Sequence, residues 1–200
     1  MKPLIKILFL LLFAITINSC EKQKDPCQKE GDVYYEIPLT YRTPLQSYSG
    51  YDTLKFKSET GEIFTFYGRG LDTGYSVNSV HHDVCDLVTH YHRKYYMYYF
   101  DSSNYKTDLE FVVTVPLNSD AGADLVINVN NISFITDAHL PPLSYPHYIN
   151  NLLIGNITYN NVLKIFQDGF NTTKGYLYYS FNEGIIQIYF PDGTTLSKFK

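Results

Sequence analysis

The C-terminal stretch Ile157–Lys200 decides the fold, and it reads ITYNNVLKIFQDGFNTTKGYLYYSFNEGIIQIYFPDGTTLSKFK. Its β-branched and aromatic residues gather in four short runs: Ile157–Gln167, Tyr176–Ser180, Ile185–Phe190 and Leu196–Phe199. Clusters of Gly, Asn, Asp and Pro separate the runs, as they do where strands are joined by turns. The pattern predicts an antiparallel meander made of packing and turn residues, with no catalytic motif in it.

Alternation along Ile185–Phe190 gives a specific prediction for this strand. Side chains at i and i+2 share one face of a strand. Ile186, Ile188 and Phe190 are therefore expected in the core, and Gln187 is expected to mark the wetter face.

Upstream, short alternating runs continue to the start of the predicted domain. Leu54 and Phe56 share one face of a predicted hairpin that turns at Glu59-Thr60-Gly61. Alternation of this kind indicates a half-buried antiparallel sheet. We expect an all-β protein, an antiparallel meander or sandwich of roughly nine to eleven short strands, with period-2 patterns as the guide. The other segments that we assign are a first strand at Val33–Tyr41, a long irregular loop at Arg69–Asp83, two alternating runs at Leu109–Val115 and Leu125–Val129, and a hairpin loop at Gly155-Asn156.

The N-terminus has the features of an export signal. Lys2 and Lys6 precede an almost continuous apolar run, Leu4–Ile17. This run is short for a membrane-spanning helix and suits a secretory signal over residues 1–19. An uncleaved N-terminal anchor helix is the alternative.

The residues around Cys20 resemble a bacterial lipobox. Ile17-Asn18-Ser19-Cys20 is similar to the looser lipoprotein signals of Bacteroidota-type cell-envelope proteins, and Asn18 departs from the commonest pattern. In that family the cysteine becomes the mature N-terminus and carries acyl chains such as palmitate. The resemblance implies lipid attachment at Cys20 and a place in the cell envelope, on the outer membrane, with the periplasmic and surface-exposed faces both open.

The C-terminal stretch also resembles that family. Bacteroidota-type lipoproteins whose function is not characterised share a Tyr-x-Asn-Val run, a paired-Tyr strand and a Gly-Ile-Ile strand. The matching residues are Tyr159, Asn161, Val162, Tyr178, Tyr179, Gly184, Ile185 and Ile186. The resemblance implies an all-β envelope lipoprotein and no particular activity.

Composition divides the mature chain into a tether and a domain. Residues 20–32 are charged, without aliphatic or aromatic side chains, and cannot bury enough apolar surface to fold. Residues 33–200 form one predicted β domain, with a possible internal boundary in the Pro-rich segment 138–147. The chain has 16 basic and 20 acidic residues, and loss of Lys2 and Lys6 changes the net charge from −4 to −6. This balance argues against nucleic acid as a partner.

Two cysteines remain once Cys20 is acylated. An oxidising envelope permits Cys27 and Cys85 to form a disulfide. The alternative is that both thiols stay unpaired, because sequence does not show their Cα separation.

One cluster has the composition of a metal site. His90 and His92 share one face of a predicted strand, and His81 or Asp83 could complete the tetrahedral ligand set of a zinc-like divalent ion. The alternative is a group of solvated histidines beside a wet loop, in which case we expect no cofactor. The spacing matches none of the metalloenzyme motifs we considered.

Function remains divided between two classes. The leading hypothesis is a lipid-anchored, non-enzymatic binding or structural module whose partner is a protein, peptide or glycan. Tyr offers an apolar ring with a polar tip, and the chain has 20 of them. The densest group is Tyr91, Tyr95, Tyr96, Tyr98 and Tyr99. The second hypothesis is a metal-binding protein or metal-dependent hydrolase that uses His81, Asp83, His90 and His92.

Overall fold

A computed structural model describes residues 31–82, 87–102, 108–115, 123–136, 147–168 and 174–199. The described residues divide into two compact units: 31–33, 79–82 and 87–90 form the smaller, and the others form the larger. The predictions for the signal peptide, Cys20, Cys27 and Cys85 lie outside the described residues, as does nearly all of the segment 138–147. Within the described ranges, no helix has the length and apolar character needed to cross a membrane.

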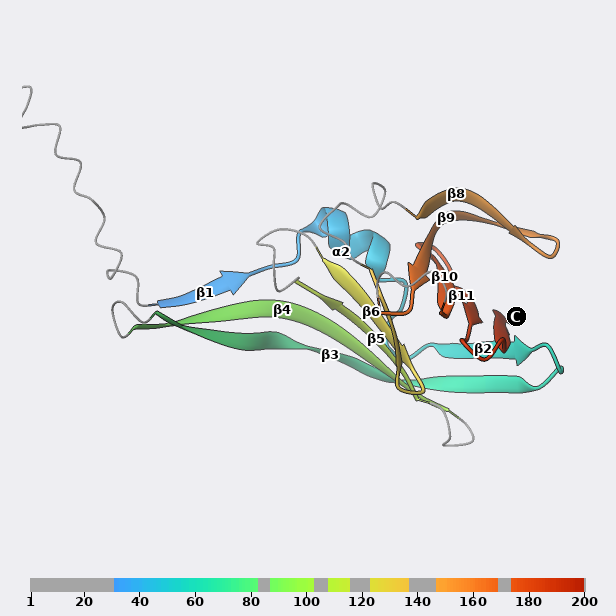
Figure 1. Ribbon diagram of the computed structural model, residues 1–200, viewed down its shortest axis with the longest axis horizontal. Helices are drawn as coiled ribbons and strands as arrows, with labels where there is room; N and C mark the ends of the chain where they lie inside the picture. Colours follow the sequence, from blue (N-terminus) through green and yellow to red (C-terminus); the bar gives the residue numbers. More distant parts are fainter. Residues whose placement is uncertain are drawn as a thin grey trace, which may run out of the picture. The chain divides into compact units, whose positions relative to one another are not determined.

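The prediction of an all-β antiparallel protein is confirmed. The described residues form twelve strands, and eleven of them follow the order β7-β6-β5-β4-β3-β2-β12-β11-β10-β9-β8, while β1 pairs with β4 (Figure 1). The strands are β1 Gly31–Tyr35, β2 Thr53–Ser58, β3 Ile63–His82, β4 Leu87–Ser102, β5 Asp108–Thr114, β6 Asp124–Val129, β7 Ile132–Ile135, β8 Tyr148–Ile154, β9 Ile157–Phe166, β10 Tyr176–Ser180, β11 Gly184–Tyr189 and β12 Thr195–Lys198; one helix, α2, spans Leu39–Leu45.

The C-terminal meander forms as predicted. Strands β9, β10, β11 and β12 pair in sequence order, each antiparallel to the next. The pairing then continues from β12 to β2, where Leu196 lies opposite Ser58. The meander therefore joins the N-terminal hairpin of β2 and β3 in one sheet.

Within the larger unit this sheet curls until two distant strands meet. Phe134 of β7 bridges Gln167, which directly follows β9, and the Asp168 N–H donates to the Ser133 carbonyl at 3.0 Å. The alternating side chains of β2, β5 and β6 point to the inside. Burying them supplies the main stabilising term at about 25 cal/mol per Å². The predicted inward residues that become buried are Leu54, Phe56, Leu109, Phe111, Val113, Val115, Leu125, Ile127 and Val129.

The predicted faces of β11 are wrong for Ile186 and for Gln187. The pairing shifts between Tyr178 and Tyr179: Tyr178 lies opposite Gln187, whereas Tyr179 lies opposite Ile185. This β-bulge interrupts the alternation, as an extra residue in one strand does. Ile188 joins the main core as expected, but Ile186 packs in a separate cluster with Tyr159 and Val162. Both faces of β11 are covered, so Gln187 is buried and the prediction of a wetter face at Gln187 fails.

The expected strand Val33–Tyr41 is also wrong beyond Tyr35. Pro38 has no N–H to donate to a strand neighbour. Its carbonyl instead accepts from the Arg42 N–H at 2.9 Å at the start of α2. The chain thus leaves the sheet after β1 and returns only at β2.

The segment Arg69–Asp83, expected to be an irregular loop, is strand up to His82. Side chains of β3 bind the backbone of β4: Thr73 Oγ1 donates to the Tyr95 carbonyl at 3.0 Å. Glycines near this segment allow close packing: a Cβ at Gly74 would lie 2.8 Å from the Tyr95 hydroxyl oxygen. A Cβ at Gly68 would lie 2.3 Å from the Gly50 carbonyl oxygen, so no larger residue fits there.

Candidate binding pocket

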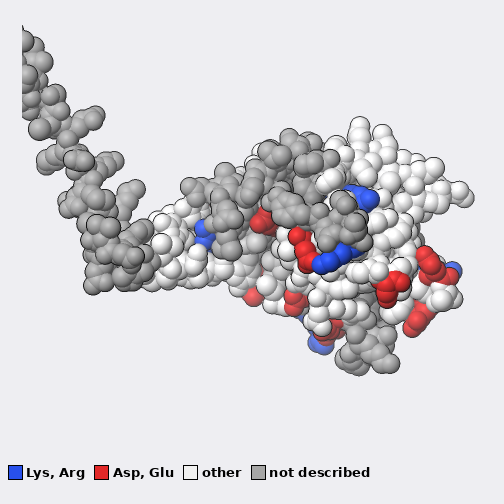
Figure 2. All heavy atoms as spheres, viewed as in Figure 1, with Lys and Arg blue, Asp and Glu red and all other residues white. Residues whose placement is uncertain are grey.

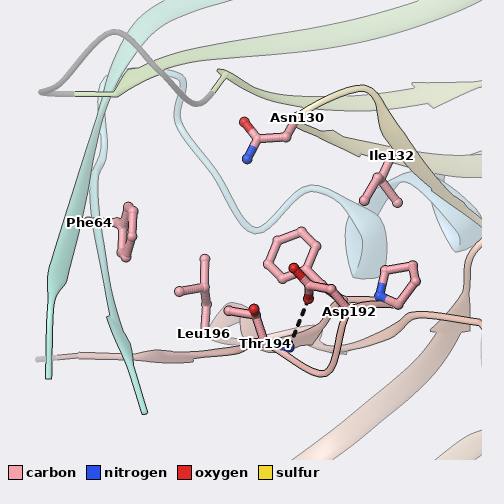
Figure 3. A pocket seen from close by; sticks show the side chains of 8 residues that line it. Phe64, Asn130, Ile132, Asp192, Thr194 and Leu196 are labelled. Carbon is pink, nitrogen blue, oxygen red and sulfur yellow. Dashed lines mark hydrogen bonds between the residues drawn. The ribbon is translucent and has the colours of Figure 1, made fainter. Parts of the chain in front are cut away.

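An apolar pocket of about 350 Å³ opens inside the larger unit, where three turns of the sheet lie close together. Phe64 comes from β3, Ile132 from β7 and Leu196 from β12, and Figure 3 shows the three side chains pointing into the same hollow. Phe190 and Pro191 line the pocket from the segment that follows β11. Leu196 is buried, whereas Phe64, Ile132 and Phe190 are half-buried and keep part of their surface open to a ligand.

Turn residues give this pocket a polar rim. Asp192 and Thr194 stand in the β11–β12 turn, and the Thr194 N–H donates to Asp192 Oδ1 at 2.8 Å (Figure 3). This hydrogen bond favours the ionised carboxylate and lowers the pKa of Asp192 below its ordinary value. The rim therefore carries a fixed negative charge at neutral pH.

The third polar residue of the rim is held by a tight turn. Asn130 and Asn131 both have positive φ, 50° and 63°, as a two-residue hairpin of the mirror-image type requires. Asn tolerates this conformation better than most residues, because its short polar side chain bonds locally. The turn fixes Asn130 at the mouth of the pocket.

A polar hollow of about 480 Å³ shares Asn130 with the apolar pocket. It is lined by Asp108, Glu110, Asn128, Asn130, Asn131 and Ser133. Asn128 Nδ2 donates to Glu110 Oε2 at 3.1 Å, and Ser133 Oγ donates to Asn128 Oδ1 at 2.7 Å. The turn at Asn130 thus stands between an apolar pocket and a hollow that contains two carboxylates.

The aromatic residues of the meander form a closed stack. The Tyr176 and Tyr189 rings stack at 4.4 Å between centroids, and Lys164 Nζ lies 4.0 Å from the centroid of Tyr176. Since β9 and β11 flank β10, the lysine and Tyr189 reach the Tyr176 ring from the strands on either side of it. A sugar ring needs an open aromatic face to stack on, so this ring is not a saccharide platform.

The densest tyrosine group of the sequence divides between core and surface. Tyr98 is buried, whereas Tyr99 is 38% exposed. Tyr96 accepts a hydrogen bond from Arg42 Nη1 at 2.9 Å, and Tyr91 stacks on Tyr35. The alternation of β4 therefore spreads the five rings over both faces, and they do not form one binding surface.

The predicted metal ligands are only partly described. The side chain of His81 and the whole of Asp83 lie outside the described residues. His90, in the smaller unit, lies with Nδ1 2.8 Å from Ser79 Oγ. His92, in the larger unit, stacks on Tyr34 at 4.4 Å. Among the described side chains, no group of three or more His, Cys, Asp and Glu is placed to hold a metal ion. The site at His81, Asp83, His90 and His92 stays a prediction.

Sequence reasoning missed the pocket because its walls are far apart in the chain. Phe64 and Leu196 are 132 positions apart, and each looks like an ordinary strand residue. The one local signal was the Pro191-Asp192-Gly193 cluster, which lies between the predicted strands Ile185–Phe190 and Leu196–Phe199 and indicates a turn but not what the turn faces.

Comparison of the chain with protein-family models, with curated proteins and with solved structures finds no match. The functional argument therefore rests on the residues and their geometry.

Proposed function

We propose that this chain is a lipid-anchored, non-enzymatic binding protein of the bacterial cell envelope that holds a peptide segment of a partner protein in the apolar pocket. The observation that carries the proposal is the pocket of Phe64, Ile132 and Leu196, with its anionic rim at Asp192. Small concave sites with apolar walls and a few fixed polar groups are the usual form of a ligand pocket.

The anchoring part of the proposal rests on Cys20. Acyl chains on this cysteine would hold the protein in the outer membrane, because each buried CH₂ contributes about 0.8 kcal/mol. The charged segment that follows would act as a flexible spacer and give the domain access to partners near the membrane.

Charge indicates which peptide would fit. Asp192 lies at the rim, and Asp108 and Glu110 lie in the hollow across the Asn130 turn. A bulky apolar side chain next to a lysine or arginine would place its apolar part in the pocket and its cation near these carboxylates.

The test is binding of a phage-displayed or synthetic peptide library to the mature protein, with blockage of the pocket as the control. Thr194 lines the pocket from an exposed turn, so Thr194→Trp should cover the entrance without disturbing the core. Asn156→Trp, in the exposed β8–β9 turn, is the matched control. We expect selected peptides to carry an aromatic or large aliphatic residue beside a basic one, and to lose at least tenfold in affinity only with Thr194→Trp.

A substitution that removes one charge tests the basic residue of the peptide separately from its apolar residue. Asp192→Asn keeps an oxygen for the Thr194 N–H but removes the charge, so the affinity for basic peptides should fall two- to fivefold at low salt. Asp168→Asn is the control, since Asp168 pairs with Lys174 elsewhere. If selected peptides bind both Thr194→Trp and Asp192→Asn with the affinity of wild type, the proposed pocket is refuted.

A further inference from the structure

A second cleft, of about 570 Å³, opens in the larger unit between β2, β12 and the β10–β11 turn. It shares no lining residue with the apolar pocket. Its volume lies in the range of about 300–1,000 Å³ that small-molecule sites occupy. Buried apolar and aromatic residues that line it are Tyr48, Leu54, Phe56 and Ile185. Charged residues that line it are Asp52, Lys55, Glu183 and Lys198.

The Tyr48 hydroxyl is the first observation that points to a ligand. Tyr48 is only 8% exposed, and its oxygen accepts a hydrogen bond from the Ile185 N–H at 2.7 Å. Among the residues that the structure describes, none accepts a hydrogen bond from the Tyr48 hydroxyl. Leaving a buried donor unsatisfied costs about 1–3 kcal/mol. The O–H group is thus available to an oxygen atom of a molecule in the cleft.

Two charged side chains of the cleft also keep hydrogen-bonding capacity. Lys198 Nζ donates to the Glu183 carbonyl oxygen at 2.5 Å and to Glu183 Oε2 at 2.9 Å. An ammonium group has three hydrogens, so one remains. Asp52 Oδ2 accepts from Ser49 and Gly50, while Oδ1 receives no hydrogen bond from the described residues. One cation and one anion are therefore each able to bind a further group.

The cleft carries charges of both signs. Lys198 and Asp52 line it with one charge each and Glu183 pairs with Lys198, whereas Lys55 is exposed on the face of β2 opposite Leu54 and Phe56. A ligand with a single charge would meet repulsion as well as attraction here. A ligand with one charge of each sign meets a complementary group for both, and complementary charges chiefly give selectivity.

We propose that this cleft binds a small zwitterion with an apolar side chain, of the class of a free α-amino acid. The carboxylate accepts hydrogen bonds from Tyr48 O–H and the Lys198 ammonium group. The ammonium group of the ligand pairs with Asp52, and the side chain lies against Leu54. This site is independent of the proposed peptide pocket, because the residues and the ligand class both differ.

Three probes test the proposal by removing one charge at a time. Phenylalanine, N-acetylphenylalanine and phenylalaninamide are titrated into the mature protein and followed by calorimetry and by amide shifts in the NMR spectrum. We expect phenylalanine to bind at least tenfold more tightly than either blocked form. The largest shifts should fall at Ile185 and Lys198.

Variants of the cleft show where phenylalanine binds, and control variants elsewhere show that a loss of affinity is specific to the cleft. Lys198→Gln should weaken phenylalanine binding at least tenfold, and Asp52→Asn should remove the preference for phenylalanine over the N-acetyl form. Lys174→Gln, in an exposed ion pair, is the matched control and should bind as wild type. Thr194→Trp closes the other pocket and should leave phenylalanine binding unchanged.

Any of three outcomes would overturn the proposal. The first is no binding of phenylalanine at 10 mM, a concentration that corresponds to about 2.7 kcal/mol of binding free energy. The second is equal binding of all three probes. The third is phenylalanine binding that is kept in Lys198→Gln but lost in Thr194→Trp. The last result would assign the aromatic probe to the apolar pocket and would leave the peptide proposal standing.

Discussion

The Tyr48 hydroxyl accepts a hydrogen bond from the Ile185 backbone N–H at 2.7 Å, and this contact joins parts of the chain that lie 137 residues apart. The Tyr48 ring packs edge-on against Phe100 and Phe111, at centroid distances of 5.4 and 5.1 Å. The segment after α2 is thereby fixed to the start of β11. Neither end of this contact is a strand partner of the other, so it adds to the sheet a connection that the ladder does not supply.

Gly184→Ala should break this connection. Gly184 has a φ of +71°, and an added Cβ would lie 2.2 Å from the Tyr48 oxygen. Gly155→Ala is the matched control, because Gly155 has a φ of +59° and nothing within 4 Å of its Cβ. Both variants should lose about 1–2 kcal/mol through the left-handed backbone. Gly184→Ala should lose at least a further 1 kcal/mol or so through displacement of Tyr48, as removal of a buried hydrogen bond does. Urea unfolding of the two variants measures the difference, and equal losses would contradict the contact.

Stability should fall steeply at alkaline pH. Burial raises the pKa of Tyr48 and Tyr179 well above the ordinary value of about 10. Their neutral forms are favoured in the folded chain, so this contribution is complete below pH 10 and is lost as the pH rises above it. Each group should lower the free energy of unfolding by about 1.4 kcal/mol per pH unit from there.

Phenolate absorbance and urea midpoints measured from pH 9 to 12 test this expectation. Tyr48 and Tyr179 should ionise only as the protein unfolds, and Tyr48→Phe should reduce the slope by about 1.4 kcal/mol per pH unit. Part of the slope should remain, because burial also raises the pKa of Tyr98 and Tyr179. A slope that Tyr48→Phe leaves unchanged would contradict the buried state of Tyr48.

Gln187 should matter to stability although it is polar. Gln187 Nε2 donates to Ser197 Oγ at 2.9 Å, and Gln187 Oε1 accepts from the Tyr189 hydroxyl at 2.8 Å. Gln187→Ala should therefore cost about 1–3 kcal/mol by leaving part-buried polar partners unsatisfied. Ile188→Ala should cost about 2–5 kcal/mol through lost burial and a cavity.

The control for this pair is Asn156→Ala, an exposed amide in a turn, which should change stability by less than about 0.5 kcal/mol. Chemical denaturation of all three variants decides the matter. If Gln187→Ala lowers the free energy of unfolding no more than Asn156→Ala does, the Gln187 side chain is solvent-exposed, as alternation alone predicts.

Cys20→Ala should release the protein from the membrane. The thiol is the only group at this position that can form the thioether of a lipoprotein, so the variant should be soluble or remain as the precursor. Detergent-phase partitioning and the mass of the mature N-terminus measure the change. A variant that partitions like wild type would remove the lipid anchor from the proposal.

Zinc content tests the predicted metal site. If His90 and His92 bind a zinc-like ion together with His81 or Asp83, purified protein dialysed against micromolar zinc should retain about one ion, because the two histidines would supply ligands from one strand face. His92→Ala should abolish retention, whereas His147→Ala should not, because His147 lies against Phe166 and not in the cluster. Protein that retains no zinc would leave these histidines with structural or solvent contacts only.

Surface charge is mixed where it can be seen. Figure 2 shows acidic and basic side chains close together around the hairpin of β2 and β3.

The sequence by itself determined which segments become strands wherever packing follows local pattern. Alternation placed Leu109, Phe111 and Val113 on the buried face of β5, and the Gly155-Asn156 turn set the β8–β9 hairpin. These features depend on neighbours along the chain, so periodicity and turn chemistry suffice to predict them.

Only the tertiary structure decided what lies on the second face of each strand and where distant segments meet. The bulge opposite Tyr178 and Tyr179 places Ile186 and Ile188 on different faces of β11. Gln187 is buried because both faces of β11 are covered. The same holds for the pocket between Phe64 and Leu196 and for the cleft beside Tyr48. Their walls meet because the sheet curls, and curling arises from the summed twist and pairing of many strands, which no single window of sequence contains.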